Sequence, residues 1–134
     1  NIINEAPYDW EMIKLHSSNV VILNKLAKEF YTNKLYSKIK PLDVYNYSMM
    51  AYIINKNYIT KFFNKYYKNG IFVFDEKYFL SDVTLLFSNH IYNYTVPLVR
   101  SKTFNSTRLN KINRYDYESN QNINNFWSNL LKKN

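Results

Sequence analysis

The sequence predicts a mainly α fold, in which about five helices form one compact multi-helix domain with at most a small two-stranded β element. Two observations lead to this class. Apolar residues recur at spacings of three and four along most of the chain, which is the period of a helix with one buried face. Glycine and proline are scarce, with one glycine and three prolines in 134 residues, so few signals interrupt an element.

Length and composition fit a single basic helical domain over residues 1–134. A chain of this length suits one hydrophobic core, and its contents of 46% hydrophobic and 19% aromatic residues exclude a disordered chain. Asparagine is expected to replace the missing glycine and proline, because it caps helices and tolerates the left-handed backbone region. We therefore expect a folded body with asparagine at many of its turns.

The first half of the chain is expected to be helical. Residues 8–39 are predicted as one helix broken near Ser17 and Ser18, with His16 at a helix end, and residues 42–54 as another beyond Pro41. Residues 58–68 form the clearest amphipathic segment, with aromatic residues on one side and lysines on the other. Asn69 and Gly70 are expected to end that helix.

The second half has weaker patterns. Residues 71–74 are apolar and β-prone and predict a strand, residues 76–92 return to helical spacing, and residues 95–99 could form a second, edge strand around Pro97. A polar basic loop or arm is expected near residues 100–118. A final helix over residues 123–131 is expected to dock through Trp127.

Positive charge is concentrated in two segments. Residues 25–68 contain nine lysines against two acids, and residues 100–134 contain seven basic residues against two acids, within a net charge of +8. Such segments are typical of surfaces that bind polyanions, although lysines also coat solvated helix faces. The candidate contact residues for a polyanion or a partner are Lys61, Lys65, Lys68, Arg100, Lys102, Arg108, Lys111 and Arg114.

The aromatic content favours an interaction domain. Tyrosine provides large, stiff contact area with a polar tip, and it is frequent at the centres of protein interfaces. The candidates for exposed contact are Tyr8, Tyr45, Tyr52, Tyr92, Tyr115 and Tyr117. We therefore expect a non-enzymatic protein–protein interaction domain, a fragment or subunit of a larger assembly. The alternative is a polyanion-binding domain that contacts RNA or single-stranded DNA.

Catalytic signatures are sparse, and no catalytic residue, cofactor or metal is predicted. The chain has no cysteine, and its single glycine excludes Gly-rich phosphate loops. A Ser–His–Asp unit of Ser88 or Ser81 with His90 and Asp82 can be drawn, but no nucleophile elbow accompanies it.

A minor alternative is a metal-dependent nuclease. Asp43 after Pro41, followed by Asp75 and Lys77 at the end of a predicted strand, resembles the PD-(D/E)xK nuclease pattern. The resemblance implies that the two acids hold a divalent cation and that the lysine activates water. An extra residue between Pro41 and Asp43 departs from that pattern. No apolar run is long enough to span a membrane, and the sequence leaves the cellular compartment open.

Overall fold

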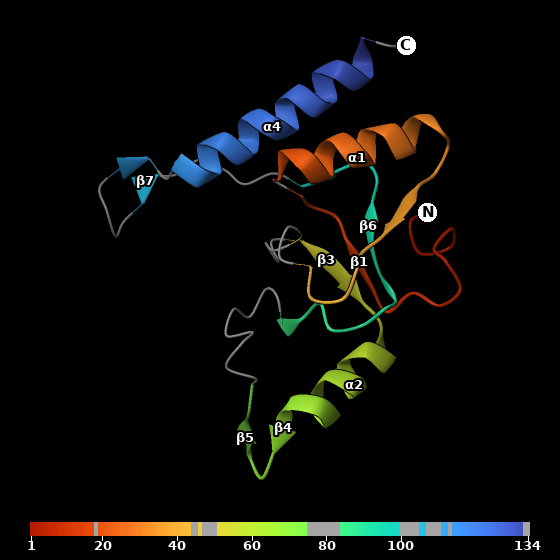
Figure 1. Cartoon of the computed structure of the whole chain (residues 1–134), viewed down its shortest axis with the longest axis vertical. Coiled ribbons are helices and arrows are strands. Elements are labelled where there is room, and N and C mark those ends of the chain that lie inside the picture. The colour runs from red at the N-terminus through yellow and green to blue at the C-terminus, as the bar shows by residue number, and fades with distance from the viewer. Residues whose placement is uncertain are drawn as a thin grey trace.

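The chain folds around a four-stranded mixed sheet, with two paired helices at one end and a third helix with a β-hairpin at the other (Figure 1). The computed structural model describes residues 1–17, 19–43, 46, 51–74, 84–99, 105–106, 111–112 and 114–132. The sheet has the order β2 (Tyr36–Lys38), β6 (Ile91–Tyr94), β1 (Met12–Lys14) and β3 (Tyr52–Ile54). Strands β1 and β6 are parallel, and the two outer strands run antiparallel to their neighbours.

The two faces of the sheet bury different sets of side chains. On one face Met12 and Ile91 are fully buried and pack with Tyr58, which comes from helix α2 (Lys56–Tyr66). On the other face Ile13 and Tyr92 pack beneath the N-terminal segment. The central strands are therefore covered on both sides, which is why residues of β1 and β6 are almost completely inaccessible.

A polar row crosses the middle of the sheet. Lys14 faces Asn93 on the neighbouring strand, and Asn93 faces Ser37 on the next, and all three side chains are buried. The Lys14 ammonium donates a hydrogen bond to the Asn46 carbonyl, and Asn93 Nδ2 donates to Asn46 Oδ1 at 2.7 Å. Because an unpaired buried charge would be costly, these bonds fix how the segment that contains Asn46 packs on the sheet.

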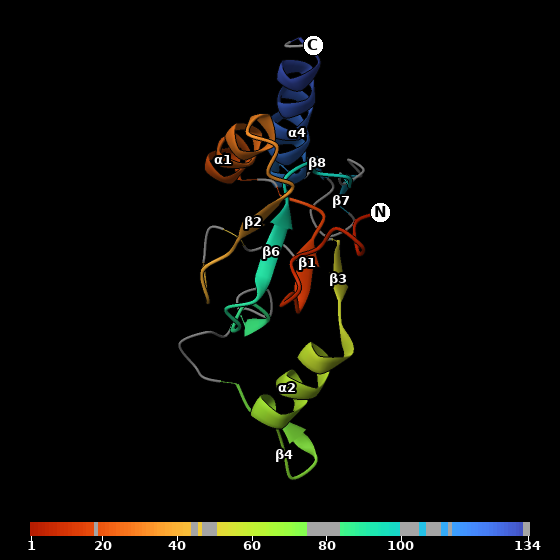
Figure 2. The ribbon, with the colours of Figure 1, turned by 90° about the vertical axis from the view of Figure 1, so that its right-hand side faces the viewer.

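The helix pair consists of α1 (Val20–Tyr31) and α4 (Arg114–Leu131), which lie side by side at the end of the sheet away from α2 (Figures 1 and 2). Leu23 and Leu26 of α1 pack against Ile123 and Phe126 of α4. This apolar seam forms a core separate from those of the sheet.

Asparagine shapes the ends of the helices, as the composition predicts. Asn19 accepts hydrogen bonds from backbone N–H groups at the start of α1, and Asn55 does the same for α2. Asn33 and Asn69 occupy the left-handed region with φ of 59° and 50°. The prediction that asparagine replaces glycine at these positions is confirmed.

The predicted mainly α class with about five helices is wrong, because the chain has an α/β fold with a four-stranded sheet. Strands β1 and β2 fall inside the first predicted helical region, strand β3 falls inside the second, and strand β6 begins at the end of the region predicted over residues 76–92. Each has only three or four residues, too few for alternation to reveal a strand. Pairing between distant segments creates this sheet, and local periodicity does not detect such pairing.

Several predicted boundaries also change. Helix α2 ends at Tyr66, and Asn69 and Gly70 form the turn of a hairpin between β4 (Tyr67–Lys68) and β5 (Ile71–Phe72) instead of a helix end. Strand β6 ends at Tyr94, so residues 95–99 form no strand. The described parts of the predicted loop over 100–118 hold strands β7 (Asn105–Ser106) and β8 (Lys111–Ile112) and the start of α4.

Candidate interaction surface

Helix α2 and the β4–β5 hairpin expose several large apolar side chains to solvent. Its members are large side chains that are between 44% and 64% exposed: Ile59, Phe63, Tyr67, Ile71, Phe72, Val73 and Phe74. These seven residues are called the α2–hairpin surface below. The helix and hairpin project together from the sheet, at the end opposite α1 and α4 (Figures 1 and 2).

The hairpin turn explains why these residues meet. Asn69 and Gly70 both have positive φ, of 50° and 87°, as in the two-residue turns whose twist matches that of paired strands. The turn pairs Tyr67 with Phe72, and the Val73 amide donates to the Tyr66 carbonyl at 2.7 Å. The chain after the helix is thereby folded back beside its last turn.

Contacts between rings hold the surface in place. The Phe72 ring has centroid distances of 5.0 Å to Tyr67, 5.4 Å to Phe63 and 5.8 Å to Phe74, and its plane is nearly parallel to that of Phe74. Aromatic pairs at such distances are attractive beyond the area that they bury. The exposed rings are therefore ordered before any partner binds, which reduces the entropy cost of binding.

A second layer of rings connects this surface to the body. Phe62 and Tyr66 lie behind the exposed rings, and both contact Phe87, with centroid distances of 6.2 Å and 5.7 Å. Phe87 stacks in turn on the buried Tyr58 at 5.2 Å. Burial raises the pKa of Tyr58, whose hydroxyl donates to the Leu85 carbonyl. The α2–hairpin surface thus rests on a continuous aromatic stack.

The lysines predicted as contacts on this helix differ in their surroundings. Lys61 forms an ion pair with the buried carboxylate of Glu11. The Lys65 ammonium lies 4.6 Å from the Phe87 ring centroid, where the ring quadrupole attracts it. The Lys68 ammonium donates to the Asn64 carbonyl at 2.6 Å, on the exposed side of α2. Lys61 therefore fixes α2 to the sheet, while Lys65 lies over an inner ring and Lys68 is bonded to the backbone of α2.

Electrostatics explain why Glu11 stays charged although it is buried. Burial alone would raise its pKa, but hydrogen bonds from Lys61 and Ser88 and the charge of Lys61 outweigh this and hold the pKa below its usual value. The pair forms a structural anchor between the segment before β1 and helix α2.

The Ser–His–Asp arrangement drawn from the sequence takes a different form. The Ser88 hydroxyl donates to Glu11 and accepts a hydrogen bond from the His90 amide. The imidazole Nδ1 of His90 lies 2.7 Å from a carboxylate oxygen of Asp9. Asp82, the acid proposed for this unit, lies outside the described residues, so the serine and histidine that the structure describes contact two other acids.

Two of the remaining predicted contact residues lie on elements away from α2. Lys111 lies in β8 and Arg114 begins α4, and both backbone positions are separated from α2 by the sheet (Figure 2). Arg100, Lys102 and Arg108 lie outside the described residues, as do Asp75 and Lys77 of the nuclease pattern. Within the described part of the chain, no group of three or more histidine and acidic residues could hold a metal ion.

The tyrosines predicted as exposed contacts divide into two groups. Tyr8 and Tyr52 are exposed, whereas Tyr92 is buried, and its hydroxyl donates to Asp9 at 2.8 Å. Burial and that bond raise the pKa of Tyr92 to about 12. The structure does not describe Tyr45 or the side chains of Tyr115 and Tyr117.

Sequence reasoning missed the outward orientation of the rings on α2 and the hairpin. The signal was present, because Asn-Gly between two β-prone pairs is the strongest short hairpin pattern.

Of the helices that the structure describes, none has both the length and the apolar character needed to cross a membrane. No protein family model, curated protein or solved structure matches this chain.

Proposed function

We propose that this chain is a protein-interaction domain that binds an acidic, partly apolar segment of a partner protein through the α2–hairpin surface. The observation that carries the proposal is the exposure of seven large apolar side chains on a helix and the hairpin that directly follows it, each of them about half exposed. Four of them, Phe63, Tyr67, Phe72 and Phe74, are joined by ring contacts. Exposed apolar side chains gathered in this way cost solubility, and they usually mark a binding site.

The chemistry around the rings supports an acidic partner. Residues 56–74 contain four lysines and no acidic residue, and only Lys61 is paired with a described carboxylate, that of Glu11. A symmetric dimer through this surface would bring the lysines of two copies together, which like-charge repulsion opposes. A different protein that carries aspartate or glutamate beside apolar residues would match both the positive charge of the lysines and the apolar side chains of this surface.

The ring geometry favours a protein over a nucleic-acid strand. Bases bind single-strand platforms by stacking on free ring faces. Here Phe72 and Phe74 stack on each other at 5.8 Å, and Phe63 and Tyr67 meet Phe72 at an angle, so these rings cover parts of one another's faces. Edges and aliphatic side chains remain exposed, and these suit apolar side chains of a peptide.

Selection from a displayed library of random 12-residue peptides tests the proposal. Selected sequences should be enriched in aspartate or glutamate together with Phe, Leu or Trp, and one synthetic peptide from the selection serves as the probe. Ile71→Asp and Phe72→Ser should each weaken binding of that probe by about tenfold or more, because they remove central apolar contacts. Val21→Ser, a change at an exposed apolar residue of α1, is the matched control and should leave binding unchanged.

Two outcomes contradict the proposal. The first is selection of peptides without acidic residues, or of peptides whose binding survives both substitutions. The second is a selection that yields no peptide, while the chain binds vesicles of phosphatidylserine and phosphatidylcholine or a 20-residue thymidine strand. For this outcome, that binding must be lost in Ile71→Asp. Such a result would assign the surface to a membrane or a polyanion instead.

A further inference from the structure

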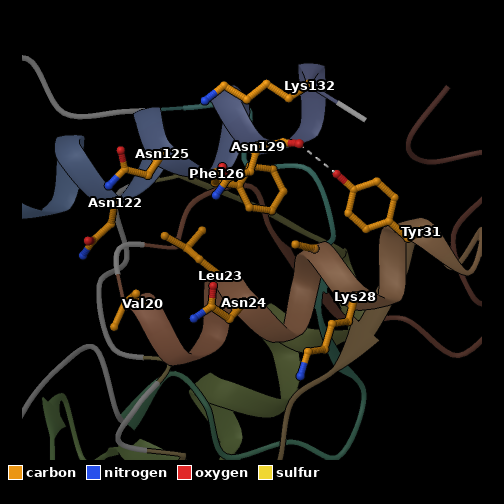
Figure 3. A pocket seen from close by; sticks show the side chains of 11 residues that line it. Val20, Leu23, Asn24, Lys28, Tyr31, Asn122, Asn125, Phe126, Asn129 and Lys132 are labelled. Atoms are coloured by element: carbon orange, nitrogen blue, oxygen red, sulfur yellow. Dashed lines mark hydrogen bonds between the residues drawn. The ribbon is translucent and has the colours of Figure 1, made fainter. Parts of the chain in front are cut away.

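A second candidate site lies between α1 and α4, on the side of the pair shown in Figure 3. The two helices enclose a groove with a cavity volume of about 580 Å³. Its polar lining consists of four asparagines and two lysines, namely Asn24, Asn122, Asn125, Asn129, Lys28 and Lys132. There is no carboxylate among the described residues that line it, so this lining is both rich in amides and positively charged.

Helical spacing places the polar side chains in two rows, with three amides on α4 and one amide and one lysine on α1. Asn122, Asn125 and Asn129 follow one another at intervals of three and four, so they lie along one face of α4. On α1, Asn24 and Lys28 are four residues apart and face the same groove (Figure 3). The floor between the rows is apolar and includes the buried Leu23 and Phe126. A ligand here meets amides on both sides and hydrocarbon beneath.

The dimensions fit a short extended peptide. From Asn122 to Lys132 a helix rises by about 15 Å, at about 1.5 Å per residue. An extended chain advances by about 3.3 Å per residue, so about four to five residues span the groove. An asparagine side chain both donates and accepts hydrogen bonds, and it can therefore pair with the N–H and C=O groups of an extended backbone.

The two cations lie toward one end of the groove. Lys28 belongs to the last turn of α1, and Lys132 directly follows the last residue of α4. At this end the Tyr31 hydroxyl donates to the Asn129 carbonyl across the groove at 3.2 Å. A carboxylate of a bound segment would find a cation on the α1 side in Lys28, while Lys132 lies on the α4 side (Figure 3).

Of the rings among the described lining residues, that of Tyr31 alone is substantially exposed, at 40%, so the groove offers bases no run of stacking rings. The Phe126 side chain is buried in the seam between the helices, and Tyr31 is tied to the opposite helix by its hydroxyl. Stacking platforms need accessible ring faces. A peptide, which needs only backbone partners and an apolar floor, is the better match.

We propose that this groove binds an extended peptide segment of about four to five residues that carries a carboxylate. The amides of Asn24, Asn125 and Asn129 pair with its backbone, and Lys28, on the α1 side of the groove, pairs with the carboxylate. The proposal is independent of the α2–hairpin surface, because α1 and α4 lie at the other end of the sheet (Figure 1).

The test is an amide NMR titration of the full chain with a pool of acetylated, amidated hexapeptides that have one fixed glutamate. The side-chain NH₂ signals of Asn125 and Asn129 should shift on titration. A pool with glutamine at the fixed position should bind at least about threefold more weakly, because it lacks the charge. A thymidine hexanucleotide forms the third arm and should leave these signals in place.

Matched variants separate a site from a general effect on the fold. Asn125→Ala and Lys28→Met should each reduce peptide binding by about threefold or more, whereas Gln121→Ala and Lys25→Met, on the same helices but outside the groove, should not. Ile71→Asp should leave groove binding unchanged. Equal shifts with both peptide pools, no shift at millimolar peptide, or shifts produced only by the oligonucleotide would overturn the proposal.

Discussion

Glu11 is the residue on which the attachment of α2 depends. Its side chain is buried, accepts hydrogen bonds from Lys61 and Ser88, and joins the segment before β1 to the helix that presents the exposed rings. Removing one partner of a buried ion pair leaves the other without compensation. The stability of the chain and the placement of the α2–hairpin surface are therefore coupled at this pair.

Lys61→Met should lower the free energy of unfolding by about 1–2 kcal/mol. This is less than the roughly 3–5 kcal/mol of a fully buried pair, because more than half of the Lys61 side chain is exposed. Urea denaturation measures the change. Lys56→Met, at the first residue of the same helix, is the control and should be neutral or slightly stabilising, since it removes a cation from the helix N-terminus. Equal losses in both variants would contradict the anchoring role of Lys61.

His16 gives a prediction for pH. It is buried, Nδ1 lies 2.7 Å from the Val99 carbonyl, and burial together with the charge of Lys14 lowers its pKa below 6.5. As the pH falls through 6.5, His16 therefore binds a proton in the unfolded chain before it does so in the folded chain. We expect the free energy of unfolding to fall as the pH decreases from 7 to 5, by at most about 1.4 kcal/mol per pH unit from this group.

The check on this pH effect is a comparison of slopes. His16→Gln removes the titrating group, and its urea unfolding should depend less on pH between 7 and 5 than that of the unaltered chain. If both chains show the same slope, the histidine is not responsible.

Single residues show what the sequence could reveal. The roles of Asn19, Asn55, Asn33 and Asn69 follow from local chemistry, because caps and left-handed positions involve only neighbouring residues. The ion pair of Lys61 could not be predicted from local sequence, because its partner Glu11 is fifty positions away in the sequence.

At the scale of elements, the β4–β5 hairpin determines the shape of the candidate surface. Gly70 has φ of +87°, where an L side chain is strained, although no atom lies within 4 Å of the position that its Cβ would occupy. Gly70→Ala should therefore cost about 1–2 kcal/mol of stability through the backbone alone. It should also weaken binding at the α2–hairpin surface, because Ile71 and Phe72 follow directly.

Asn69→Gly is the matched substitution for this turn. It keeps a residue that adopts positive φ readily, so thermal unfolding should change by far less than in Gly70→Ala. A similar loss of stability in the two variants would show that the cost does not arise from the positive φ of the turn.

Helices were easier to predict than strands for a physical reason. Helices α1 and α2 have 12 and 11 residues, so their apolar faces repeat several times and their periods are readable. Strands β1, β2 and β3 have three residues each, and their burial depends on partners from other parts of the chain. Lys14, a charged residue at the centre of the sheet, adds a polar position where the pattern of a buried strand would be apolar.

At the scale of the whole molecule, two candidate sites lie at opposite ends of the sheet (Figure 1). The helix pair carries an amide-lined groove, and α2 with its hairpin carries exposed rings beside lysines. The sequence analysis proposed Lys61, Lys65 and Lys68 of this element as contact residues, but the exposure of the rings on the same element was not predicted. The arrangement is therefore one in which aromatic residues serve both the core and the surface.

The central claim is that the rings of α2 and the hairpin face solvent, and one NMR measurement tests it directly. A soluble gadolinium chelate relaxes side-chain protons according to their exposure. We expect relaxation enhancements for Ile71, Phe72 and Phe74 that are several times those of the fully buried Tyr58 and Leu86. Enhancements on the hairpin as low as those of Tyr58 would place the rings in the core and contradict the claim.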